Sequence, residues 1–106
     1  MPIVAVATIT PLPEHREAVQ TALEESVPQV HREHGCQLYA LHQSKDEFVL
    51  VEQWASADAM RAHGAGEPFR ALNEALDGKL AGPLDLKIVR PVPCGTPEQG
   101  RLVADG

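Results

Sequence analysis

The sequence has little of what marks several large classes of protein. It contains two cysteines, Cys36 and Cys94, which are too few for the disulfide framework of a small secreted domain. We therefore predict two free thiols rather than a Cys36–Cys94 bridge. No internal repeat divides the 106 residues, so we expect one domain.

Basic residues and long hydrophobic runs are also scarce. Nine lysines and arginines stand against 15 aspartates and glutamates, giving a net charge of -6, which disfavours phosphate-rich partners. Pro11 and Pro13 end the apolar start of the chain, well short of the roughly 20 apolar residues that a membrane span requires. We predict a cytoplasmic protein that binds neither nucleic acid nor a membrane.

Hydrophobic periodicity, in contrast, is clear. Runs of β-branched residues and alternating apolar residues predict strands over residues 3–10, 36–44, 47–55 and 83–91. Helical spacing of apolar residues predicts helices over 13–35, 56–63 and 68–80. Pro28 is expected to kink or interrupt the first helix. The βαββαβ order predicts an α+β, ferredoxin-like fold with a four-stranded antiparallel sheet.

The two central strands should form a hairpin. If Lys45 and Asp46 are its turn residues, Tyr39 lies opposite Glu52, and Trp54 lies further along the same face. Ser56 is a suitable N-cap for the short helix that follows.

The sheet is predicted to offer apolar side chains on both faces, although helices cover only one. A soluble monomer rarely exposes so large an apolar surface, so we predict that two copies pack sheet against sheet as a homodimer. The domain then covers residues 1–92. Residues 93–106, rich in proline and glycine, are expected to form an arm that packs on the partner subunit.

The segment "HREHGC" invites a metal assignment, because His31 and His34 are three residues apart and Cys36 follows. We favour polar residues at a helix end instead, and predict no metal site.

The run from "EHGCQLYALHQSKDEFVLVEQWASADAMRAH" to "PFRAL" resembles the antibiotic biosynthesis monooxygenase family. The family pattern has a Gly-Cys and Tyr hairpin, Glu-x-Trp, a capping Ser, and a His nine residues after the Trp. The matching residues are Gly35, Cys36, Tyr39, Glu52, Trp54, Ser56 and His63. The resemblance covers roughly residues 3–92.

The resemblance implies a dimeric α/β barrel with a pocket between sheet and helices in each subunit. It also implies oxygenation of a quinol or polyketide-like phenol by dioxygen, with no cofactor. Two alternatives stay open: an isomerase or lyase of a small carbonyl metabolite, and a noncatalytic dimer that binds an aromatic ligand.

Oxygenation without a cofactor requires a base in a dry cavity, because dioxygen accepts electrons from an organic anion. His63 is the candidate base, since an imidazole accepts a proton near neutral pH; the alternative is a helix-capping charge. Glu52 is the second catalytic candidate. It either accepts a hydrogen bond from Tyr39, or orients His63, or forms an ion pair at a surface edge or interface.

Four residues are candidates for substrate binding. Trp54 either stacks on a flat substrate or belongs to the core, and Tyr39 shares its face of the hairpin. On the last helix, Phe69 lies on the apolar stripe. Asn73 is expected close to that stripe, where its amide either binds a substrate oxygen or makes a structural hydrogen bond.

Overall fold

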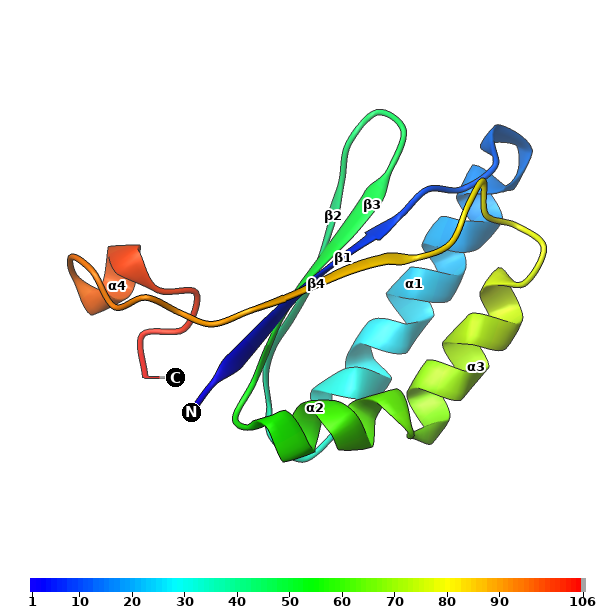
Figure 1. The fold of residues 1–106 in the computed structure, drawn as a ribbon. Coiled ribbons are helices and arrows are strands. Elements are labelled where there is room, and N and C mark those ends of the chain that lie inside the picture. The colour runs from blue at the N-terminus through cyan, green and yellow to red at the C-terminus, as the bar shows by residue number, and fades with distance from the viewer. Residues whose placement is uncertain (106) are drawn as a thin grey trace.

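The computed structural model describes residues 1–105 and has the predicted α+β, ferredoxin-like architecture (Figure 1). Four strands form one antiparallel sheet in the order β2-β3-β1-β4. The strands are β1 (Ile3–Ile9), β2 (Cys36–Gln43), β3 (Phe48–Trp54) and β4 (Asp85–Val89). The helices are η1 (Pro13–His15), α1 (Arg16–His31), α2 (Ala57–Gly64), α3 (Glu67–Leu76) and α4 (Pro97–Gly100).

Helix α1 continues through Pro28, so the predicted interruption is wrong. Proline removes the hydrogen bond to the carbonyl four residues earlier, here that of Glu24. Both residues are exposed, which allows water to replace the lost donor. Val19, Leu23 and Val30 are buried on the opposite side of the helix, and their packing favours an unbroken helix.

The hairpin has the predicted register. The amide of Ser44 donates to the carbonyl of Glu47 at 2.8 Å, which leaves Lys45 and Asp46 as the central turn residues. Tyr39 consequently lies opposite Glu52. A shift of one residue would have turned every side chain of one strand to the other face, so this turn decides what faces the helices.

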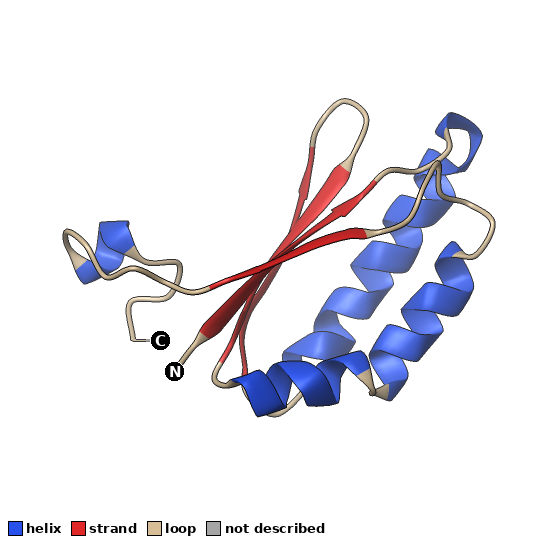
Figure 2. Ribbon diagram, in the orientation of Figure 1, coloured by secondary structure: helices blue, strands red, loops and turns tan. Residues whose placement is uncertain are grey.

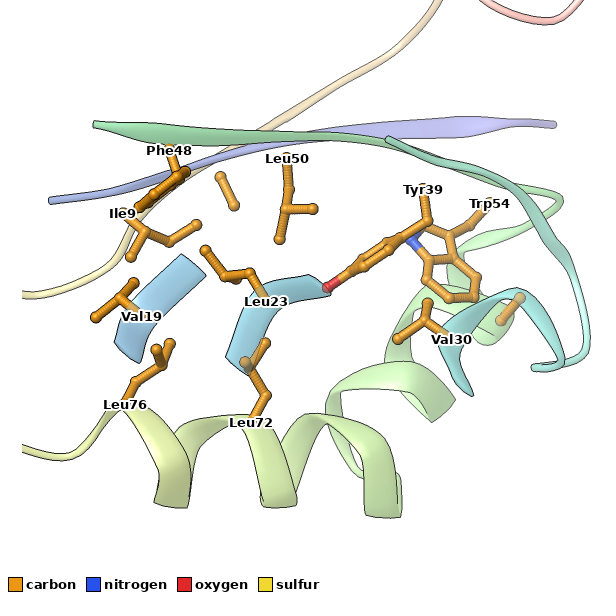
Figure 3. Close-up of a cluster of buried hydrophobic side chains, with 12 residues drawn as sticks. Ile9, Val19, Leu23, Val30, Tyr39, Phe48, Leu50, Trp54, Leu72 and Leu76 are labelled. Carbon is orange, nitrogen blue, oxygen red and sulfur yellow. The ribbon is translucent and has the colours of Figure 1, made fainter. Parts of the chain in front are cut away.

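The core lies between the helices and one face of the sheet (Figures 2 and 3). Phe48 and Ile9 lie at one end of the cluster, and Tyr39 and Trp54 at the other. Burial of each large apolar side chain stabilises the fold by about 1.5–3 kcal/mol. The most deeply buried apolar residues are Ile9, Val19, Leu23, Val30, Phe48 and Trp54.

Helices α1–α3 leave the opposite face of the sheet uncovered, and the C-terminal segment with the short helix α4 lies near one end of it (Figure 2). Val6 and Val51 are paired across β1 and β3 on this face, and Ala40 of β2 pairs with Val51. All three are only partly buried, and Val89 on the edge strand is 47% exposed. This face therefore carries partly exposed apolar side chains, and its coverage by a second copy stays a prediction.

The C-terminal segment leaves the body of the domain after β4 and carries the short helix α4 (Figure 1). Its residues Gly100, Arg101 and Leu102 line a hollow together with Val4 and Gln53 of the same chain. Packing of this segment on a partner subunit stays a prediction, and Gly106, the last residue of the predicted arm, lies outside the described residues.

None of the helices in residues 1–105 is both long enough and apolar enough to cross a bilayer.

Candidate active site

A cavity of about 150 Å³ lies between the helix-facing side of the sheet and helices α2 and α3. Most of its lining is aliphatic and comes from all four strand regions and both helices. Tyr39, Glu52, His63 and Phe69 contribute the aromatic and ionisable side chains. On the β4 side the wall is formed by Leu86 and Ile88, which are 51% and 58% exposed. The cavity is therefore largely apolar, and the large hydrophobic side chains of its β4 wall are exposed.

Helix α2 brings His63 to this cavity. The helix begins where the Ser56 hydroxyl accepts a hydrogen bond from the amide of Ala59 at 3.1 Å, as predicted for an N-cap. His63 follows in the last turn and is 6% exposed. The helix is short, so this cap and the packing of Ala59 determine where the imidazole lies.

Three aromatic rings surround the imidazole of His63. Its ring centroid is 4.6 Å from Trp54 in a stacked arrangement, 5.4 Å from Phe69 and 5.8 Å from Tyr39, which meets it edge-on. The whole sequence has four aromatic residues, so three of them pack around one histidine. Contacts of this kind restrict the ring to one orientation.

The two ring nitrogens of His63 have different surroundings. Nδ1 lies 3.1 Å and 3.2 Å from the two carboxylate oxygens of Glu33. Nε2 makes no hydrogen bond to the described residues. Every fully buried side-chain nitrogen or oxygen among those residues has a hydrogen-bond partner, so Nε2 is not fully buried. Nε2 is therefore accessible, and the cavity is the space that His63 lines.

The sequence analysis did not select Glu33. This residue follows α1 and is 30 positions from His63, so no local spacing links the two. The signal that was available is its place at the start of the "EHGC" run, two residues before a glycine.

Gly35 explains how the loop after α1 approaches α2. Its φ is +82°, and a Cβ at this position would lie 2.5 Å from the Cβ of Ala59. Its carbonyl also accepts a hydrogen bond from the amide of Ala55 at 2.8 Å. Only glycine permits this conformation and this distance at low cost, so Gly35 allows the loop that carries Glu33 to lie against the helix that carries His63.

Glu52 is buried, and its hydrogen-bond partner is Trp54, whose Nε1 donates to Oε1 at 3.0 Å. The hydrogen bond from Tyr39 and the ion pair at a surface edge are not formed within this chain, because the indole of Trp54, two residues along the same strand face, occupies the carboxylate. Orientation of His63 by Glu52 and an ion pair at an interface stay predictions. Burial raises the pKa of Glu52, as does Glu33, whereas the Trp54 hydrogen bond and His63 lower it.

Tyr39 is buried at the cavity wall. Burial raises the pKa of its phenol well above the usual range, and the charge of Glu52 raises it further. Tyr39 is therefore a neutral phenol, which can donate or accept a hydrogen bond but cannot act as an anionic base.

A family model described as "Antibiotic biosynthesis monooxygenase" matches residues 2–75. The chain belongs to this family. The resemblance read from the sequence is thereby confirmed. Membership of this family supports monooxygenase activity at the family level.

Relatives of this family member match it over most of its length. The chain is 28% identical over 100 residues to "Probable quinol monooxygenase YgiN" of Escherichia coli, which covers 84% of this chain and 95% of the relative. It is 26% identical over 93 residues to "Putative monooxygenase Rv0793" of Mycobacterium tuberculosis, covering 86% and 92%. The solved structure of PA3566 from Pseudomonas aeruginosa has a TM-score of 0.80 at 28% identity, covering 87% and 95%.

Two of the predicted binding residues, Trp54 and Asn73, do not line the cavity of this protein. Trp54 is fully buried behind His63 and stacks on the imidazole instead of facing the cavity. Asn73 is exposed and lines an open surface hollow with Arg70 and Glu74. Leu72 and Leu76 face the interior, and Asn73 follows Leu72 by one residue, which turns it by about 100° around α3.

The histidines and the cysteine of the segment "HREHGC" were considered above as possible metal ligands. His31 contacts the carbonyl of Tyr39 through Nε2 at 3.0 Å, and both cysteines are free thiols. Residues 1–105 contain no group of three His, Cys, Asp or Glu side chains placed to hold a metal ion.

Proposed function

We propose that the protein is a cofactor-independent monooxygenase that oxidises a small phenol or quinol with dioxygen. The observation that carries this proposal is His63 at the wall of an apolar cavity, with Nε2 accessible and without a protein partner. The name of the E. coli relative, a quinol monooxygenase, supports the substrate class.

The first step is removal of the phenolic proton by Nε2 of His63. The resulting anion is rich in electrons, and in an apolar cavity it is poorly stabilised by water, which favours electron transfer to dioxygen. One oxygen atom enters the ring and the other leaves as water. The organic product has gained one oxygen and lost two hydrogens, which are those of the water.

Glu52 stabilises the positive charge that His63 acquires in this step. Its carboxylate lies in the same cavity wall, and the two groups attract one another electrostatically. Tyr39 and Phe69 line the cavity and contact the flat face or edge of the substrate.

The charges at the cavity favour a neutral substrate. The described lining includes the carboxyl group of Glu52 and neither lysine nor arginine. A phosphorylated or carboxylated metabolite would therefore enter next to a carboxylate without a compensating cation. A volume of about 150 Å³ corresponds to a single aromatic ring, by comparison with engineered apolar cavities that bind benzene. A larger phenol requires displacement of the exposed β4 wall.

The working unit of this proposal is a homodimer. Val6, Val51 and Ala40 leave an apolar surface on the helix-free face of the sheet, and a second copy would cover it. In this dimer, residues 93–106 form the arm on the partner. Truncation after Pro91 is then expected to weaken the dimer in light scattering, and an unchanged dimer would contradict the arm.

The direct test is dioxygen uptake, measured above the autoxidation rate without protein, with a single-ring quinol such as methylhydroquinone and with the two-ring substrates 1-naphthol and menadiol, which require displacement of the β4 wall. We expect acceleration by the wild type and loss of most of it in His63→Ala. No acceleration by the wild type would overturn the proposed function. Tight binding without turnover would indicate a ligand-binding dimer, and turnover of a carbonyl metabolite under argon would indicate an isomerase or lyase.

A further inference from the structure

Glu33 is the hydrogen-bonding partner of the candidate base. Both of its carboxylate oxygens lie within 3.2 Å of Nδ1 of His63. The side chains of His63 and Glu33 are 7% and 18% exposed, so little water competes for the contact. A hydrogen bond to a charged acceptor in such surroundings is stronger than one at an open surface.

The backbone holds Glu33 in this place from both sides. Its amide donates to the carbonyl of Val30 at 2.9 Å at the end of α1. Two residues later, Gly35 lies against Ala59 of α2 and accepts the amide of Ala55. The loop is therefore tied both to the helix that precedes it and to the region that carries His63.

We propose that Glu33 is a positioning residue that holds His63 in the tautomer with the proton on Nδ1. A carboxylate has no proton to donate, so the ring nitrogen that faces it must be the donor. In a neutral imidazole the other nitrogen is then the acceptor. Nε2, the nitrogen without a partner among the described residues, is thereby left free to take a proton from a substrate.

Among residues 1–105, no other group that faces the imidazole can select its tautomer. Trp54 of β3 and Phe69 of α3 contact it through their ring faces or edges, and Tyr39 of β2 meets it edge-on. Glu52 of β3 accepts its hydrogen bond from Trp54. Among the described residues, the hydrogen bonds of the His63 ring are those to Glu33. Glu33 also faces the ring that becomes positively charged once Nε2 takes a proton from the substrate. This second role rests on the proposed function.

The tautomer can be measured without a substrate. In ¹⁵N NMR of the wild type at about pH 9, above the reference titration of an imidazole, Nδ1 of His63 is expected at the protonated position and Nε2 at the unprotonated position. The signals are assigned by their absence in His63→Gln. In Glu33→Gln the amide can donate to Nδ1, so both tautomers are expected. A wild type with the proton on Nε2, or a Glu33→Gln spectrum unchanged from the wild type, would overturn the proposal.

Kinetics provide the second readout. With 1-naphthol, Glu33→Gln should lower kcat at least about tenfold, but by less than the 10²–10⁴-fold that a general base supplies, and should leave KM within about twofold. Glu25→Gln is the matched control, because it removes the same charge from an exposed position on α1; it should keep the wild-type kcat. Adding Glu33→Gln to His63→Ala should cause no further loss.

The two proposals fail separately. If dioxygen uptake depends on His63 but Glu33→Gln retains full kcat, Glu33 is not a positioning residue, and the proposed function stands. If the wild type shows the expected tautomer but does not accelerate dioxygen uptake, the proposed oxygenation is wrong, while the role of Glu33 in holding the tautomer is supported.

Discussion

The indole of Trp54 connects the candidate base to the buried carboxyl group. Its ring stacks on His63, with 4.6 Å between centroids and 28° between planes, while its Nε1 donates to Glu52 at 3.0 Å. One fully buried side chain thus orients two ionisable groups. Trp54 acts on the cavity from behind these groups, although its own ring is not part of the wall.

Replacement of Trp54 by phenylalanine should therefore affect stability through Glu52. Trp54→Phe removes the N–H donor and leaves a buried carboxyl group unpaired, at a cost of roughly 1–3 kcal/mol in addition to the lost packing. Urea unfolding measures the change. The same substitution in a Glu52→Leu background, which has no acceptor for the indole N–H, should cost less, and equal costs in both backgrounds would show that the hydrogen bond contributes nothing.

Glu52→Gln should stabilise the protein at neutral pH and reduce its activity. Burial raises the pKa of Glu52 in the folded state, so the folded protein binds this proton more tightly than the unfolded chain. Ionisation therefore destabilises the fold as the pH rises above the ordinary carboxyl pKa, and this penalty is complete above the raised value. Glutamine avoids the penalty and its oxygen still accepts from Trp54. The stability gain, followed by urea unfolding from pH 7 downward, should shrink as the pH falls; a gain that is constant with pH would contradict this explanation.

Gly35→Ala should be strongly destabilising. The alanine would occupy a φ of +82° and place its Cβ 2.5 Å from that of Ala59, for a combined cost of roughly 2–5 kcal/mol from the left-handed backbone and the overpacked contact. Gly78 is the matched control, because its φ is +76° but no atom lies within 4 Å of an added Cβ. Gly78→Ala should show only the backbone cost of about 1–2 kcal/mol. Similar unfolding midpoints for the two variants would mean that the approach to Ala59 is unimportant.

A charge introduced on the helix-free face of the sheet tests whether this face forms the dimer interface. Val51→Lys would place a lysine between Val6 and Ala40, and in a symmetric dimer the partner's lysine would be nearby. We expect association to weaken by about a hundredfold or more, seen as a halved mass in light scattering with unchanged circular dichroism. Thr21→Lys, at an exposed position on α1, should stay dimeric. A monomeric wild type would contradict the dimer itself.

Local patterns in the sequence determined the elements and the hairpin. Side chains alternate along a strand, so a two-residue turn at Lys45 and Asp46 was enough to place Tyr39 opposite Glu52. The cap at Ser56 could also be read from the sequence, because a capping hydroxyl acts on an amide three residues away. The family pattern likewise selected His63, which lies at the cavity.

Other parts of the site were decided by tertiary structure alone. Glu33 meets His63 across 30 residues because a loop at Gly35 packs on α2, and no periodicity encodes such a meeting. Asn73 lies outside the cavity because the packing of Leu72 and Leu76 sets the rotation of α3. The continuity of α1 at Pro28 likewise depends on burial of the opposite helix face. Short-range rules determine which side chains share a face, whereas the partner that a side chain meets depends on how separate elements pack.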